Sequence, residues 1–358
     1  MKKLIPLLLS GAMLLSLAAC GSGSGDGGDP QQSGDPQGGG SGGGSDYKIA
    51  VLLPGSPTDG GYCQQGADGV RAIQAKYGLD DSQVAIIDSV TTADAAKAEA
   101  EEMAAEGYTV IFGQGGQFAE YFKEVAQDYP DTWFVTNGGA ITGDNQFPMC
   151  MSTEQGGYVC GVLGALMSQT GTLGTVVSGD YPSFTKPSVG YSVGAKSVNP
   201  NAVVKFAVLS ASNSNEAYET LKNQIQSGAD FFFPNADEGN SGAIKAIAES
   251  DAAYGVGVFG DYISGAPERV AGNMVVDAPG AYVAVFDAIV NGEAKGEIMF
   301  LGMAEGVISF QWNEELKATL PEDVVSQVDQ AVEDIKAGKI DIPNEYDIGE
   351  TGIDQYFN

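Results

Sequence analysis

The sequence predicts an α/β protein of two similar lobes, each built on a doubly wound parallel sheet. Two stretches, residues 47–137 and 171–261, repeat the same order of four apolar runs separated by amphipathic segments. The runs are continuously apolar rather than alternating, which is typical of strands that are covered on both faces. Strands that alternate with helices become parallel neighbours, and two such sheets side by side leave a cleft between the lobes.

The eight apolar runs are the expected strands. In the first stretch they centre on Ile49, Ile86, Ile111 and Phe134, and in the second on Gly174, Val204, Phe232 and Val256. Each interval between runs is long enough for a helix and two short loops. Repetition of this order in both stretches indicates two lobes of the same design.

The N-terminal residues indicate export and membrane attachment. Lys2 and Lys3 precede an apolar run over residues 4–17, which has the layout of a secretory signal and is too short for a membrane span. The run ends in Leu-Ala-Ala-Cys at Cys20, the bacterial lipobox pattern. We expect residues 1–19 to be a signal peptide and Cys20 to carry lipid such as palmitate. The Gly/Ser-rich residues 20–45 are then a flexible tether to the outer face of the cell membrane.

Composition excludes several classes of function. The chain has 47 acidic and 17 basic residues and a formal charge of −30, so it repels nucleic acid and favours neutral or cationic ligands. It has no histidine, which removes the usual general base and the commonest metal ligand. Cys63, Cys150 and Cys160 match no zinc spacing, so we expect no metal and no cofactor. The sequence does not say whether Cys150 and Cys160 come close enough to form a disulfide.

Aromatic rings beside carboxylates and amides follow several of the expected strands. Such a set suits a heterocycle, a sugar, or both joined, because ring faces stack while Asp and Asn bond hydroxyl and ring nitrogen groups. Capping of the next helix, or packing of the loop, is the alternative for each residue. The candidates are Asp59, Tyr62, Tyr181, Phe184, Asn235, Asp237 and Asp261. The Gly-rich residues 113–118 fit no dinucleotide or P-loop spacing and are interpreted as a close backbone approach to a ligand.

Several motifs together resemble the basic membrane protein family, the lipoprotein substrate-binding components of ABC importers. The resemblance covers nearly all of the chain after the tether. It rests on the segments 161–165, 167–174 and 190–200, supported by residues 124–126, 129–131, 228–230, 306–307, 335–340 and 342–343.

The resemblance implies a type I periplasmic-binding-protein fold that closes on a nucleoside, with purine nucleosides favoured, and passes it to an ABC permease. A binding role of this kind implies that the protein is not an enzyme. By this likeness Tyr62 stacks on the base, Asp59 accepts a bond from the ligand, and Phe118 is a further ring. Tyr181 or Phe184 closes over the ligand from the second lobe. Asp237 and Asp261 match acidic strand ends, Asp261 being suited to paired ribose hydroxyls.

The chain departs from the family pattern at three positions of the expected site. Cys63 follows the stacking ring where relatives carry a larger polar residue, Gly116 stands where many carry Phe, and Phe259 replaces the first acid of a Val-Asp-x-Asp-Gln motif. The identity of the base is therefore open, and riboflavin or another heterocycle is an alternative ligand.

The expected domain boundaries follow the repeat. The N-terminal lobe spans residues 46–153 and is completed by about 264–298, and the C-terminal lobe spans 154–263 and is completed by about 299–358. Crossings near Thr153, near Ile263 and near residues 296–301 then form a hinge between rigid lobes. We expect a monomer.

Two other classes of function remain. A secreted nucleoside or glycoside hydrolase could use Asp59, Asp237 and Asp261 as a carboxylate set. A surface sensor would use the same cleft with a different partner. A sugar-binding cleft is a further alternative, although Lys186 is the one base that we place near the site.

Overall fold

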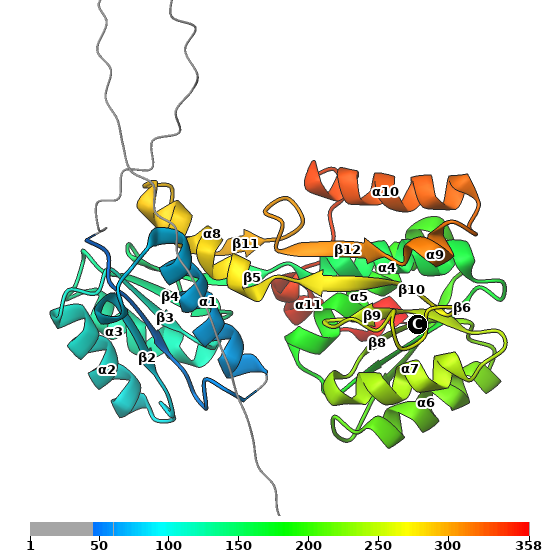
Figure 1. Cartoon of the computed structure of the whole chain (residues 1–358), viewed down its shortest axis with the longest axis horizontal. Helices are drawn as coiled ribbons and strands as arrows, with labels where there is room; N and C mark the ends of the chain where they lie inside the picture. Colours follow the sequence, from blue (N-terminus) through cyan, green and yellow to red (C-terminus); the bar gives the residue numbers. More distant parts are fainter. Residues whose placement is uncertain (1–45, 60, 358) are drawn as a thin grey trace, which may run out of the picture. The chain divides into compact units, whose positions relative to one another are not determined.

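The computed structural model describes residues 46–59 and 61–357. Within this range the chain forms two six-stranded sheets with helices on both faces (Figure 1). In spatial order the first sheet consists of β11 (Met299–Leu301), β5 (Gln146–Met151), β4 (Trp133–Asn137), β3 (Val110–Gly113), β1 (Ile49–Leu52) and β2 (Val84–Ile87). The second consists of β12 (Ile308–Trp312), β10 (Val270–Val276), β9 (Tyr254–Val258), β8 (Phe231–Asn235), β6 (Thr172–Val177) and β7 (Val203–Val208).

The two sheets have equivalent topology, which confirms the predicted pair of doubly wound lobes. Every neighbouring pair in the first sheet is parallel, and in the second sheet only β10 and β12 are antiparallel. All eight strands expected from the apolar runs are present. The sequence did not predict β5, β10, β11 and β12, of which β5 contains Pro148 and β12 alternates between buried and less buried positions.

Helices of the first lobe cover both faces of its sheet because successive strand residues point to opposite sides. Ile49 and Val51 pack toward α1 and α8, whereas Ala50 and Leu52 pack toward α2 and α3. The bounds are α1 (Tyr62–Tyr77), α2 (Ala93–Ala105), α3 (Ala119–Ala126) and α8 (Ala278–Val290). Single 3₁₀ turns at Asp81–Gln83 and Gly116–Phe118 precede β2 and α3.

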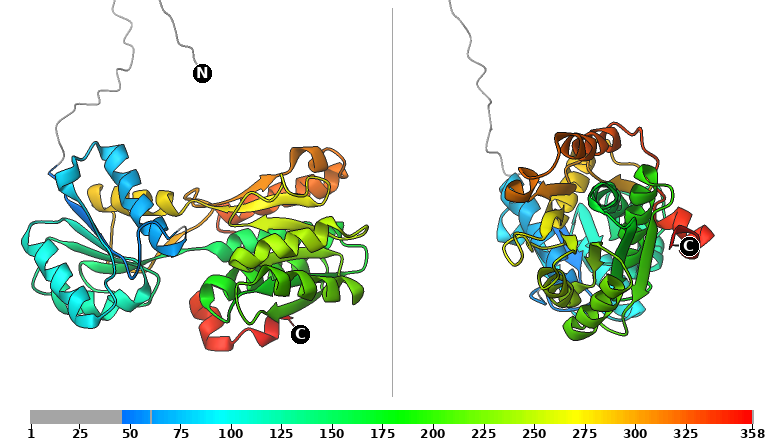
Figure 2. Two further views of the ribbon diagram at one scale, coloured as in Figure 1. Left: turned by 60° about the horizontal axis from the view of Figure 1, so that its bottom comes forward. Right: turned by 90° about the vertical axis from the view of Figure 1, so that its right-hand side faces the viewer.

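The second lobe repeats the arrangement. One face of its sheet packs on α4 (Thr153–Met167) and α5 (Pro182–Val198), and the other on α6 (Ser214–Gln226) and α7 (Asn240–Ala248), which a 3₁₀ turn at Asp237–Gly239 precedes. α9 (Glu314–Lys317) and α10 (Glu322–Lys336) follow β12. The C-terminal helices α11 (Glu345–Thr351) and α12 (Asp354–Phe357) pack on α5, red against green in Figure 2.

The chain passes between the two sheets three times. The crossings lie between β5 and α4, between β10 and α8, and between β11 and β12. The expected boundary near Ile263 does not coincide with the second crossing, because β10 pairs with β9 and so keeps residues 264–276 in the second lobe. The third crossing follows Leu301, because β11 still pairs with β5 in the first sheet.

The expected signal peptide, the lipidation at Cys20 and the tether lie outside the described residues. No helix in the described part of the chain is long and apolar enough to cross a bilayer.

Helices α4 and α5 pack backbone against backbone. A Cβ atom added at Gly157 or Gly161 would overlap the carbonyl oxygen of Pro187 or Tyr191 on α5. Reciprocally, a Cβ atom at Gly190 or Gly194 would overlap a carbonyl oxygen of α4. Because rigid main chain rather than a movable side chain fills each of these positions, only glycine fits without a shift of one helix.

Replacing Gly161 with Ala should therefore destabilise the second lobe. The added methyl group must push α4 away from α5, which costs about 1–3 kcal/mol for overpacking of this kind. A thermal melt of the purified protein measures the loss. Gly349→Ala is the control, because no atom lies within 4 Å of a Cβ atom at Gly349 in α11. Equal melting temperatures for both variants would contradict the account of the α4–α5 contact.

Candidate functional site

In the first lobe, Asp59 fixes the segment that connects β1 to α1. The Asp59 carboxylate accepts hydrogen bonds from the backbone amides of Gly61 (2.8 Å), Cys63 (3.1 Å) and Gln64 (3.0 Å), at the start of α1. Loss of solvent raises the pKa of Asp59, but the hydrogen bonds together outweigh this effect and lower the pKa. Most of the acceptor capacity of this carboxylate is thus spent on the helix start, which is the capping alternative.

Tyr62 lies at the beginning of α1 with 46% of its surface exposed. Its hydroxyl group is 3.5 Å from the carbonyl oxygen of Asn137 at the end of β4. Loss of solvent around the hydroxyl group raises the Tyr62 pKa, and the nearby Glu345 carboxylate adds to the rise. The ring is therefore neutral at physiological pH and presents an accessible aromatic face at the strand ends.

Gln114 is a residue of this region that sequence reasoning did not single out. It is fully buried directly after β3, and its amide nitrogen donates to the carbonyl oxygen of Tyr62 (2.5 Å). Its side-chain oxygen accepts bonds from Asn137 (3.3 Å) and from the hydroxyl group of Tyr282. One buried amide thus fixes the ends of β3 and β4 against α1. A polar residue immediately after an apolar strand was the available signal.

Phe118 does not share this surface. It is 1% exposed and packs against Phe122, with ring centroids 6.0 Å apart, in the core beneath α2 and α3. The structure therefore offers no free face of this ring to a ligand, and Phe118 is left out of the candidate site. The Gly-rich segment 113–118 does follow a strand, as predicted. The sequence does not show, however, whether the Phe118 side chain points toward a ligand or into the core.

The second lobe brings two aromatic rings to the start of α5. Tyr181 is 64% exposed and Phe184 is half-buried, with ring centroids 6.5 Å apart. Asn235, fully buried at the end of β8, donates to the carbonyl oxygen of Phe184 (3.0 Å) and so ties this turn to the sheet. The side-chain oxygen of Asn235 has no hydrogen-bond partner in the structure. It is a free acceptor next to the aromatic pair.

Two carboxylates lie just beyond the carboxyl ends of β8 and β9, at the same edge of the sheet. Asp237 follows β8 with a positive φ of 48°, and Asp261 follows β9; both are exposed. Although the residue is exposed as a whole, partial loss of solvent around its carboxylate raises the pKa of Asp237, and a hydrogen bond from the hydroxyl group of Ser212 (3.4 Å) partly offsets the rise. Asp261 accepts from the Ile263 amide (3.1 Å) and from the Asn273 side chain (3.2 Å), which fix its orientation.

A buried charge cluster lies at the crossing from β5 to α4. The Lys186 ammonium group donates to the Glu345 carboxylate (2.7 Å) and to the carbonyl oxygen of Met151 (2.9 Å). The Glu154 carboxylate lies 3.9 Å from the same nitrogen. Burial raises the pKa of Glu154 to about 7, against the attraction of Lys186. One cation thus faces two carboxylates, and Glu345 holds the close ion pair.

The C-terminal segment connects this cluster to the first lobe. The hydroxyl group of Tyr346 donates to the carbonyl oxygen of Gly139, in the loop after β4 (2.6 Å). A pocket of about 240 Å³ lies between α11 and the first turn of α5, with Lys186 and Glu345 in its wall. Residues 345–346 therefore bond to both lobes beside the hinge.

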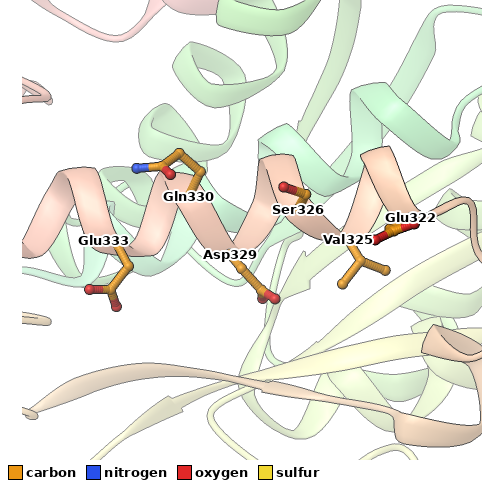
Figure 3. Close-up of a pocket in the computed structure, with 6 residues that line it drawn as sticks. All are labelled: Glu322, Val325, Ser326, Asp329, Gln330 and Glu333. Carbon is orange, nitrogen blue, oxygen red and sulfur yellow. The ribbon is translucent and has the colours of Figure 1, made fainter.

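A second hollow, of about 380 Å³, runs along α10 and is a poor candidate site. Figure 3 shows that the side chains that line it come from one helix, and three of them are acidic: Glu322, Asp329 and Glu333. A site without a second wall cannot enclose a ligand.

The described cysteines Cys63, Cys150 and Cys160 are buried free thiols, so the Cys150–Cys160 disulfide that the sequence left open is not formed. Burial raises the pKa of Cys150 to about 12, although Lys186 opposes the shift. In the residues that the structure covers, no group of three His, Cys, Asp or Glu side chains could hold a metal ion.

Comparison with known proteins gives consistent results. The family described as "ABC transporter substrate-binding protein PnrA-like" matches residues 47–346. The chain is 28% identical to the transcriptional activator protein med of Bacillus subtilis (strain 168), over 73% of this chain and 80% of that protein. It is 25% identical to a purine-binding protein of Brucella abortus (strain 2308), over 82% of each.

Among solved structures, an ABC transporter system solute-binding protein from Aeropyrum pernix K1 matches with a TM-score of 0.64. It is 17% identical and the match covers 87% of this chain and 97% of that one. Together with the two equivalent sheets, this likeness confirms the expected type I periplasmic-binding-protein fold.

The raised pKa of Glu154 predicts a pH-dependent stability. An unfolded glutamate titrates near 4.5 and the folded one near 7, so the folded state binds the extra proton and stability falls as pH rises from about 4.5 to 7. The loss is up to about 3 kcal/mol, because each pH unit between the two pKa values contributes about 1.4 kcal/mol. Melting temperatures of wild type and Glu154→Gln should differ little near pH 5 and diverge by pH 8, with the variant more stable. Glu124→Gln, an exposed carboxylate paired with Lys97, is the control. The same pH slope in wild type and Glu154→Gln would contradict the raised pKa.

Proposed function

The chain belongs to the family of PnrA-like ABC transporter substrate-binding proteins, and on that premise we propose that it is a nucleoside receptor of an ABC importer. It captures a nucleoside, a purine nucleoside first of all, between its lobes and delivers it to a membrane permease. The observation that carries the proposal is the presence of accessible rings and oriented carboxylates at the carboxyl ends of strands in both sheets. Ligands of doubly wound sheets bind at these ends.

The side chains suit the two halves of a nucleoside. Tyr62 in the first lobe and Tyr181 in the second offer exposed rings for the faces of a purine base. Asp261, held by Asn273, is an oriented acceptor for two vicinal ribose hydroxyls. The exposed carboxylate of Asp237 is a further group for exocyclic amines or hydroxyls, and buried Asn235 supports the site by fixing the turn that carries Phe184. The similarity to a purine-binding relative favours a purine over other heterocycles.

Asp59 supports the site indirectly. Because three backbone amides occupy its carboxylate, it fixes the turn that carries Tyr62, while its remaining lone pairs are available to the ligand. Phe184 extends the ring surface beside Tyr181.

Capture proceeds by hinge closure about the three crossings. A ligand that contacts both lobes binds the closed state more tightly than the open one, and only this differential affinity shifts the equilibrium. The permease then recognises the closed form. Lipid at Cys20 and the tether over residues 20–45 keep the receptor at the outer face of the membrane, which raises its effective concentration near the permease.

A surface sensor with the same ligand site is the alternative, and the name of one relative, a transcriptional activator, is compatible with a regulatory role. The charge of −30 opposes direct contact with DNA, so a sensor of this design would act through a protein partner. Co-purification with a permease or with a signalling protein separates the two roles.

Ligand identity is tested by thermal shift of protein stripped of bound ligand by unfolding and refolding. The panel contains adenosine, guanosine, inosine, cytidine, uridine, free purines, riboflavin and several sugars. A ligand at about 100 times its Kd adds about 2.7 kcal/mol of stability. We expect the purine nucleosides to raise the melting temperature. A response confined to riboflavin or a sugar would overturn the choice of ligand, and release of free base from a nucleoside would indicate a hydrolase.

Tyr62→Ala and Tyr181→Ala should each weaken binding of the responding nucleoside. Loss of one stacked ring costs about 1–3 kcal/mol, or roughly 10–100-fold in Kd, by analogy with base stacking on aromatic side chains. Isothermal titration calorimetry measures the change. Tyr254→Ala is the matched control, because Tyr254 begins β9 at the opposite edge of the sheet. Unchanged affinity in both strand-end variants would place the ligand elsewhere.

A further inference from the structure

Phe259 has a backbone conformation that is unusual for its residue type. It follows β9 directly with φ of 59°, in the left-handed region that bulky residues rarely adopt. Among the described residues, three non-glycine residues have a positive φ: Ser89, Asp237 and Phe259. Two of the three, Asp237 and Phe259, follow the adjacent strands β8 and β9 at the same edge of the second sheet.

Packing of the side chain does not offset the cost of this backbone conformation. The Phe259 side chain is 45% exposed, so much of the benefit of burying a phenyl ring is lost. Within the described part of the chain it takes no part in the ring–ring contacts that hold the other aromatic residues together. A glycine would adopt the same backbone without cost and would expose no apolar ring.

Contacts on both sides of the loop hold the strained conformation. The backbone amide of Phe259 donates to the carbonyl oxygen of Met274 in β10 (3.1 Å). Asn240 at the start of α7 donates to the carbonyl oxygen of Val258 (3.2 Å). Asn273 accepts from the Tyr262 amide (3.3 Å) and donates to Asp261. The loop is thus tied to β10 and to α7, so the backbone of Phe259 is held in its left-handed conformation. Strain that the surrounding structure maintains in this way gathers at ligand sites.

The groups at this strand end and at the neighbouring ones match one kind of ligand. Asp261 stands two residues further along as an oriented carboxylate, and Asp237 lies two residues beyond the end of the neighbouring strand β8. Tyr181 follows β6, on the other side of β8. A phenyl ring has no donor or acceptor, so at this strand end the chain offers an apolar face next to a hydroxyl acceptor. That combination fits a planar ring attached to a polyol.

We propose that Phe259 contacts the ligand and sets its specificity, packing its ring face on the heterocycle so that the site selects nucleosides over free sugars. The proposal rests on the nucleoside-binding function proposed above and adds a specificity-determining residue to it. Asp261 then binds the hydroxyl groups, and Phe259 binds the planar ring. A free sugar makes only the first of these contacts and therefore binds more weakly than a nucleoside.

The test compares Phe259→Gly and Phe259→Tyr with wild type, using calorimetric Kd values for the responding nucleoside and for ribose, and the melting temperature without ligand. Phe259→Gly should keep or raise the melting temperature, because glycine relieves the left-handed strain, yet weaken nucleoside binding at least tenfold. Its nucleoside-to-ribose selectivity should fall by a similar factor. Phe259→Tyr retains the ring and should bind within about threefold of wild type. Val203→Ala is the control, because Val203 is exposed and begins β7 at the opposite edge of the sheet. It should change neither the Kd for the nucleoside nor the nucleoside-to-ribose selectivity.

The outcomes separate this proposal from the one on which it rests. If wild type binds a nucleoside and Phe259→Gly binds it equally well, the role of Phe259 is refuted while the nucleoside function stands. If wild type binds no member of the ligand panel, the nucleoside function fails and the role of Phe259 fails with it. A large fall in the melting temperature of Phe259→Gly would also count against the proposal, because it would mean that the ring stabilises the fold.

Discussion

The backbone contact between α4 and α5 is the constraint on which the hinge region depends. Four glycines let the main chains of the two helices touch, and this fixes the first turn of α4 against α5. Lys186 of α5 is thereby buried next to Glu154 and the end of β5, where the chain leaves the first sheet. Glu345 completes the charge cluster from the C-terminal segment. A buried cation with only one carboxylate at close range tolerates little displacement, so the cluster fixes where the crossing begins.

The strand order decides which side chains can act together. Because both sheets are parallel over their central strands, the loops after β1, β3 and β4 meet at one edge, and those after β6, β8 and β9 at the corresponding edge of the second sheet. Buried amides then fix these loops: Gln114 in the first lobe, and Asn235 and Asn273 in the second. The exposed rings and carboxylates are therefore held on rigid supports, as a binding site requires.

The sequence predicted the lobes, eight of the twelve strands in the described residues and most of the strand-end residues, because continuous apolar runs and the residues after them are local signals. It missed features that depend on residues far apart in the chain. β10 and β12 are recognisable only by their pairing, and the Lys186–Glu345 ion pair joins residues 159 positions apart. Phe118 was expected to contact the ligand, but its ring is buried in the core that α2 and α3 cover. The strain at Phe259 is a property of the backbone and has no sequence signature.

Hydrogen–deuterium exchange with and without the best-binding nucleoside tests the central claim, that one ligand contacts strand ends of both lobes. The account predicts increased protection at residues 54–59 and 61–62 of the first lobe and at residues 178–184 and 259–262 of the second. The outer face of α10 should exchange at the same rate in both samples. Protection confined to one lobe, or found along α10 instead, would contradict the claim.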